Sequence, residues 1–149
     1  MTSNINLFFQ FLLSFIAGIG FSILFSVNKR NIFLTSLCSG ISWFFFQLFL
    51  SLGINSIFST LLSGIILGFC TEIFARINKS PALSFILVGI IPLVPGLKTY
   101  KGMINLINNN TQEGVSFLLE AAFIAVAIAV SILVTSSIAN LYNKIIAKK

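Results

Sequence analysis

The sequence predicts an all-α integral membrane protein with five transmembrane helices, the fourth of which is broken by proline and glycine. Of the 149 residues, 57% are hydrophobic and only 8% are charged, and the mean hydropathy is +1.05. A soluble domain carries about a quarter charged residues and cannot hide so large an apolar fraction from water. Strand-like alternation is absent, and backbone groups in lipid must be paired within each segment. These observations favour helices and exclude a β-barrel.

The elements are expected in five apolar runs. A bilayer core of about 30 Å needs about 20 apolar residues as a helix. Short polar breaks separate runs at residues 5–27, 32–52, 57–75, 82–97 and 115–141. The first run is too long for a cleavable signal peptide and has no basic segment before it. The runs use nearly every residue, so residues 1–149 are expected to form a single five-span domain without a soluble part.

Basic residues predict the orientation of these spans, because cytoplasmic connections carry an excess of Lys and Arg. Alternate connections place two basic residues on one side, Lys98 and Lys101, and seven on the other: Lys29, Arg30, Arg76, Lys79, Lys144, Lys148 and Lys149. The N-terminus is therefore expected outside and the C-terminus in the cytoplasm. A re-entrant fourth segment would change the count to six against three, which fits the rule less well.

The composition excludes most catalytic chemistry. The chain has no His and no Asp, so a His-based triad, a zinc site with His ligands and an EF-hand are impossible. No P-loop motif is present to bind ATP, and nine scattered basic residues do not make a nucleic-acid face. We therefore expect no enzyme activity, no cofactor and no metal. The two cysteines, Cys38 and Cys70, are interpreted as small packing residues.

The fourth run contains the most informative segment. Pro92, Pro95 and Gly96 should break the helix at membrane depth. The freed backbone groups must then face protein or water, and transporters build substrate sites from such broken helices. The alternative is a simple kink, since proline and glycine are common in membrane helices. Tyr100 lies just past the break, as do Lys98 and Lys101, for which interfacial anchoring is the expected role.

Two carboxylates fall inside apolar runs. Glu72 precedes Arg76 by four residues, the favourable order for an ion pair on one helix. An interfacial pair is the expected role there, with gating or proton transfer as the alternative. Glu120 has no such partner nearby in the sequence. An unpaired carboxylate in a membrane is a functional candidate by default, although it could also titrate normally in a water-filled crevice.

Small residues recur at helical spacing within the runs. Gly64 and Gly68 are four residues apart in the third run, and Gly18 and Gly40 lie on small-residue faces of the first two. Such faces let membrane helices approach closely. They predict helix packing and say nothing about a substrate.

Several of these residues also form a pattern that resembles a known family. The chain contains Glu72-x-x-x-Arg76, Pro81, a P-L-V-P-G segment at residues 92–96, and Tyr100. The first two runs add Gly20, Phe21, Phe25, Val27, Arg30, Gly40 and Trp43. Together these residues resemble the small, YjjB-like subunit of the threonine/serine exporter (ThrE) family, over nearly the whole chain. Lys98 and Lys101 depart from the family pattern.

The resemblance implies a function, a partner and a location. It implies export of small amino acids such as threonine and serine, or of dicarboxylates such as succinate, driven by the proton gradient. It also implies a bacterial cytoplasmic (inner) membrane protein working with a larger, YjjP-like membrane subunit. Independently of the resemblance, five helices of about 20 residues are too few to enclose a pathway wide enough for an amino acid. Inverted repeats of transporters normally contribute one half of the site each, so this chain is expected to pair with a second half. The alternative is a small non-transporting membrane protein that assembles with or regulates a partner.

Overall fold

The computed structural model describes the backbone of residues 7–146 and the side chains of residues 7–141. Within these residues the chain is helical and contains no strand. The elements are α1 (Leu7–Leu24), η1 (Lys29–Asn31), α2 (Ile32–Ser51), α3 (Ser56–Ile77), α4 (Ala82–Ile90), η2 (Ile91–Leu93), α5 (Gly96–Ile107) and α6 (Thr111–Ile146).

Four helices are long and apolar enough to cross a membrane, and a bent pair makes a fifth candidate. The four are α1, η1 with α2, α3 and α6. The pair joins residues 82–93 to residues 96–107 with a bend of 47°. Each of the four single helices buries between 17% and 39% of its most apolar window, so most of its apolar surface faces outward. That distribution fits a multi-pass membrane protein with a hydrocarbon surround.

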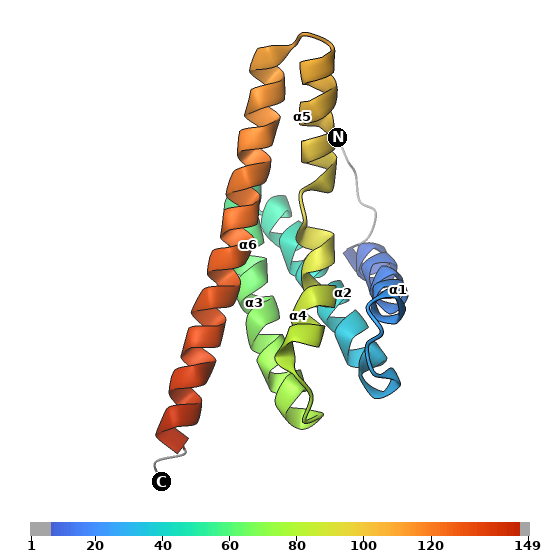
Figure 1. Ribbon diagram of the computed structural model, residues 1–149, viewed down its shortest axis with the longest axis vertical. Helices are drawn as coiled ribbons and strands as arrows, with labels where there is room; N and C mark the ends of the chain where they lie inside the picture. The colour runs from blue at the N-terminus through green and yellow to red at the C-terminus, as the bar shows by residue number, and fades with distance from the viewer. Residues whose placement is uncertain (1–6, 147–149) are drawn as a thin grey trace.

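The helices run alternately up and down, and neighbours in the chain pack together (Figure 1). The helix α2 contacts α1, α3 and α4, while α6 packs against α3 and α5. The core where α2, α3 and α4 meet consists of Cys38, Leu67, Ala75 and Phe85. This order leaves α1 at one edge of the bundle and the lower part of α6 at the other.

The polar stretch at residues 98–114 is the main difference from the sequence pattern, because nearly all of it is helical. Gly96–Ile107 forms α5 and Thr111 already begins α6, so only a tight turn separates them. A Cβ on Gly102 would overlap Leu118, and one on Gly114 would overlap Leu106. The two glycines thus permit the close contact that stabilises α5 against α6.

The resulting α5–α6 hairpin extends beyond the other helices (Figure 1). The helix α6 has 36 residues, about 54 Å at 1.5 Å per residue, whereas a span needs about 20 residues. The excess length is paired with α5 rather than left as an isolated helix end. The hairpin therefore forms an extension at the end of the bundle opposite the C-terminal end of α6.

Small residues allow the spans to approach closely at several positions. A Cβ on Gly64 would overlap Ser131 of α6, and one on Gly68 would overlap Thr135. A Cβ on Gly18 would lie 2.9 Å from the Cα of Ser36, and one on Gly40 would lie 2.7 Å from the Phe11 ring. In a membrane such contacts drive helix association through van der Waals packing.

Hydroxyl groups add polar links between the helices. The Ser14 hydroxyl donates to the Ser39 carbonyl at 2.8 Å, and the Ser39 hydroxyl donates back to the Ser14 carbonyl at 3.0 Å. Ser22 and Thr35 share a hydrogen bond of 2.7 Å nearer the other end of the same helix pair. Each such bond in a membrane contributes about 0.6 kcal/mol on average. These pairs help to set the register of α1 on α2.

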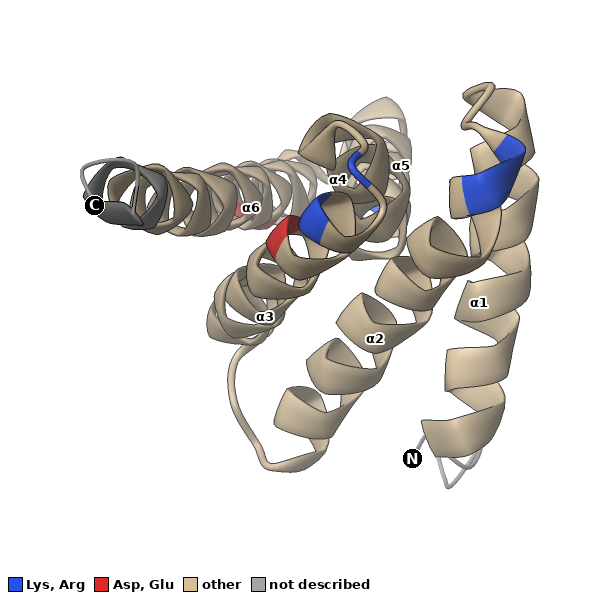
Figure 2. Ribbon diagram, turned by 90° about the horizontal axis from the view of Figure 1, so that it is seen from below, with Lys and Arg blue, Asp and Glu red and all other residues tan. Residues whose placement is uncertain are grey.

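The basic connections lie together at one end of the bundle. Figure 2, viewed from below, shows basic segments at the connection between α1 and α2 and at that between α3 and α4. The Asn78 amide of the second connection donates to the Asn31 side-chain oxygen of the first at 2.9 Å. Lys29, Arg30, Arg76 and Lys79 thus share one end. The side chain of Lys144 and all of Lys148 and Lys149 lie outside the described residues.

The contact at Gly68 gives a stability prediction. Gly68→Leu should lower the free energy of unfolding by about 1–3 kcal/mol, the usual cost of overpacking, because the new side chain must displace Thr135 of α6. Gly20→Leu is the matched control, since a Cβ there meets nothing within 4 Å. Denaturant unfolding of the purified protein in detergent measures both. Equal stability of the two variants would contradict the α3–α6 contact.

Candidate functional site

The break between α4 and α5 is built from two prolines and an extended residue. The helix α4 ends at Ile90, and Pro92 lies within η2. Val94 is extended, with φ −63° and ψ 128°, and its N–H donates to the Ile91 carbonyl at 3.2 Å. The Gly96 N–H donates to the Val94 carbonyl at 2.8 Å. Local hydrogen bonds thus replace part of the helical ladder that the prolines interrupt.

Neighbouring helices hold the break in place. On one side, the Ser42 hydroxyl of α2 donates to the Gly89 carbonyl in the last turn of α4 at 2.7 Å. On the other side, Leu93 is buried against Ile124 and Ile128 of α6. The break is therefore packed between α2 and α6 and is supported by protein, as a backbone irregularity inside a membrane would require.

A cavity with a mainly apolar lining and a few polar side chains adjoins the break on its α2 side. This α1–α2 cavity has a volume of about 640 Å³ and is lined by residues of α1, α2 and η2: Gln10, Leu13, Ser14, Ala17, Phe21, Ser39, Trp43, Gln47, Ile91 and Pro92. Its size falls in the range of about 300–1,000 Å³ that is typical of ligand sites. The cavity brings the glutamines of two different helices to the first residues of the break.

The predicted substrate residues are not all brought to this cavity. Pro92 lines it. Pro95 precedes α5 without lining the cavity, and a Cβ on Gly96 would meet open space. Tyr100 is 61% exposed on α5. Pro95, Gly96 and Tyr100 therefore do not line the cavity.

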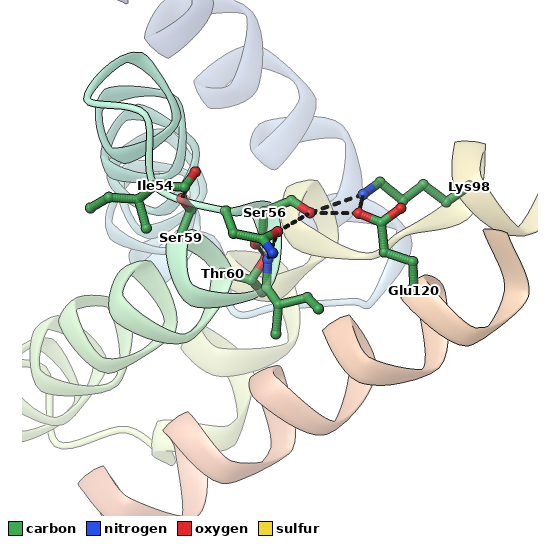
Figure 3. Close-up of polar contacts among 8 residues, drawn as sticks. Ile54, Ser56, Ser59, Thr60, Lys98 and Glu120 are labelled. Carbon is green, nitrogen blue, oxygen red and sulfur yellow. Dashed lines mark hydrogen bonds and ion pairs between the residues drawn. The ribbon is translucent and has the colours of Figure 1, made fainter. Parts of the chain in front are cut away.

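A charged cluster lies at the start of α5, where three elements meet (Figure 3). Lys98 of α5 forms an ion pair with Glu120 of α6. The Ser56 hydroxyl, at the first residue of α3, donates to the same carboxylate at 2.8 Å. The Lys98 ammonium also donates to the Ser56 oxygen, at 3.0 Å. Glu120 is thus not an unpaired carboxylate, and Lys98 is more than an interfacial anchor.

The cluster is accessible enough to respond to its surroundings. The Lys98 and Glu120 side chains are 29% and 35% exposed. An ion pair with this exposure contributes up to about 1 kcal/mol to stability, so it can break at modest cost. The cluster joins α3, α5 and α6 while the Glu120 carboxylate is ionised. Protonation of Glu120 would weaken these contacts.

The second predicted carboxylate site lies towards the basic end. Glu72 and Arg76 line a small pocket of about 170 Å³ between α3 and α6, together with Phe69, Ile73, Ile138 and Ala139. The pocket is separate from the α1–α2 cavity and from the Lys98 cluster. The ion pair between Glu72 and Arg76 stays a prediction from their spacing.

The two cysteines are the remaining candidate groups. Cys38 and Cys70 are free thiols, and Cys38 is fully buried in the core. Among the described residues, no three metal-ligating side chains lie together.

Comparison with known proteins places this bundle in a family. A family model described as "Threonine/Serine exporter, ThrE" matches residues 10–138. No curated protein and no solved structure shows significant similarity to the chain. The match runs through the bent α4–α5 pair and covers well over half of the chain, and it confirms the resemblance drawn from the P-L-V-P-G segment. The chain therefore belongs to the threonine/serine exporter (ThrE) family.

Proposed function

We propose that this chain is the small half of a secondary exporter of threonine and serine, with dicarboxylates such as succinate as the alternative substrates. The observation that carries the proposal is the broken α4–α5 helix beside the α1–α2 cavity, in a chain of the exporter family. The proposal places it in the bacterial inner membrane. Family membership supports transport over the alternative of a non-transporting assembly protein.

The proposed transporter needs a second, larger membrane subunit. The α1–α2 cavity is walled by only two spans and the break. Inverted-repeat transporters complete such a half-site with elements of the other half. The exposed apolar side chains of the spans can face such a subunit as well as lipid. In this proposal the larger, YjjP-like subunit supplies the second half.

The break supplies the proposed contact with the substrate carboxylate. Gly96 begins α5, and the preceding Pro95 provides no side-chain cap. The free N–H groups and positive dipole of a helix start favour an anion by about 0.3–1 kcal/mol at exposed sites. In our proposal Pro92, Pro95 and Gly96 shape this helix start. Tyr100, one turn later, then donates a hydrogen bond to the substrate or closes the site.

Glu120 is the proposed carrier of the coupling proton. Its carboxylate joins α6 to Lys98 of α5 and to Ser56 of α3. Protonation would remove the charge that holds Lys98 and would let the start of α5 move relative to α3. Glu72, with Arg76, is the second candidate for proton transfer or gating at the opposite end.

Neutralising Glu120 tests this coupling. In the assembled transporter, Glu120→Gln should retain substrate exchange but lose its dependence on the proton gradient, because the amide cannot load a proton. Lys98→Gln should also uncouple transport and cost about 1 kcal/mol of stability or less. Lys101→Gln, an exposed lysine on the same helix, is the matched control. Full gradient dependence in Glu120→Gln would shift the proton role to Glu72.

The proposed orientation can be tested with a reporter that fluoresces only in the cytoplasm. Fused after Lys149, the reporter should be bright, because the basic connections are expected inside. The same reporter inserted in the α5–α6 turn at Asn109 should be dark. A dark C-terminal fusion that is expressed at a normal level would contradict the five-span topology.

The requirement for a second subunit predicts the behaviour of the purified chain. Reconstituted alone in proteoliposomes, it should move neither serine, threonine nor succinate, because half of the pathway is missing. Adding the larger subunit should produce transport of radiolabelled substrate. Robust transport by the small chain alone would replace the split transporter with a homo-oligomer.

A further inference from the structure

The small pocket between α3 and α6 combines an apolar wall with charged side chains. Four apolar residues and two charged residues line it: Phe69, Ile73, Ile138, Ala139, Glu72 and Arg76. Its volume of about 170 Å³ lies below the range of about 300–1,000 Å³ that is typical of sites enclosing a drug-sized solute. The α3–α6 pocket is therefore suited to part of a longer molecule, such as a segment of one acyl chain.

The apolar wall of this pocket belongs to the outward-facing surface of the helices. Phe69 and Ile73 of α3 and Ile138 of α6 are all exposed. They lie in two helices that are long and apolar enough to cross a membrane. Lipid tails are as apolar as leucine, so an acyl chain is a compatible neighbour for these side chains. A chain lying along α3 and α6 would contact all three.

Charge distinguishes the end of the bundle at which the α3–α6 pocket lies. Four basic residues and one acidic residue are found towards this end: Lys29, Arg30, Arg76, Lys79 and Glu72. Four positive charges and one negative charge give these side chains a net charge of +3. At the other end, Lys98 and Lys101 are balanced by Glu113 and Glu120. Basic residues near a membrane surface attract anionic headgroups, so such a headgroup is favoured at the pocket end.

Arg76 joins the apolar wall to this basic end. It lies in the last turn of α3 and is exposed. It follows Phe69 by seven residues and Ile73 by three, so the three side chains share one face of the helix. A guanidinium offers five N–H donors in a planar fork that matches phosphate. Arg76 can therefore contact a phosphate and still keep contacts within the protein, including one with Glu72.

We infer that the α3–α6 pocket binds an anionic phospholipid, with the phosphate on Arg76 and one acyl chain along Phe69, Ile73 and Ile138. Basic pockets between membrane helices typically bind anionic headgroups. The inference goes beyond the proposed exporter function and does not depend on it. A bound lipid would join α3 and α6 at this end of the bundle, as the cluster of Ser56, Lys98 and Glu120 joins them at the other.

Lipid binding can be measured on the purified full chain by native mass spectrometry. Phosphatidylglycerol and phosphatidylcholine with identical acyl chains differ in the net charge of the headgroup. The first phosphatidylglycerol should bind about fivefold more tightly than the first phosphatidylcholine, the effect of one basic residue near an anionic headgroup. Inorganic phosphate at the same concentrations should leave this binding unchanged, because it has no acyl chain to contact the apolar wall.

Two arginines provide matched variants, since each substitution removes one positive charge from the same end of the bundle. Arg76→Gln should weaken binding of the first phosphatidylglycerol about fivefold. Arg30→Gln should bind like the parent chain, because the connection between α1 and α2 lies on the side of the bundle away from α6 (Figure 2). Circular dichroism of both variants checks that the helices are intact.

A phosphatidylglycerol with a photoreactive group on one acyl chain locates the site without any substitution. Cross-links in the parent chain should concentrate on Phe69, Ile73 and Ile138. Equal affinity for the two lipids, equal weakening by Arg76→Gln and Arg30→Gln, or cross-links spread over all the spans would each overturn the inference. Displacement of the lipid by inorganic phosphate would also overturn it, in favour of a site for free anions. None of these results depends on transport by the proposed assembly.

Discussion

A helix that breaks inside a membrane needs protein support for its backbone, and this requirement organises the bundle. Pro92 and Pro95 remove two backbone donors from the bent α4–α5 pair, and lipid offers no donor in their place. Three neighbours supply the support. Ser42 of α2 donates to the end of α4, Leu93 packs against α6, and Lys98 ties the start of α5 to Glu120. These contacts tie α2 and α6 to the two sides of the break.

The same supports place two chemically different sites on either side of the break. The neutral α1–α2 cavity lies beside Pro92, and the charged cluster lies just beyond Gly96. In the proposed function, separating these environments has a physical advantage. The cavity has no charged lining residue, while the ion pair stays at the partly exposed end of the break, where breaking it costs little. A proton at Glu120 would then act on the substrate only through the movement of α5.

The sequence predicts the long apolar helices well, because long apolar runs admit few other structures. It does not predict α5, although Leu97, Tyr100, Ile104 and Ile107 follow a helical spacing. Lysines and asparagines between them resemble a polar connection. The missing information is tertiary, since α5 is stabilised by the close contact of Gly102 and Gly114 with α6. Neither glycine signals its partner in the sequence.

The site shows the same division between local and long-range information. The P-L-V-P-G segment identifies the break because proline acts on its own helix. The partners of Glu120 are Lys98, 22 residues earlier, and Ser56, 64 residues earlier. No periodic pattern spans those separations. In the sequence, Gln10 and Gln47 are likewise isolated polar residues in two separate apolar runs. Their proximity depends on the packing of α1 against α2. The fold brings both glutamines to one cavity beside Pro92, and composition alone could not show that they meet.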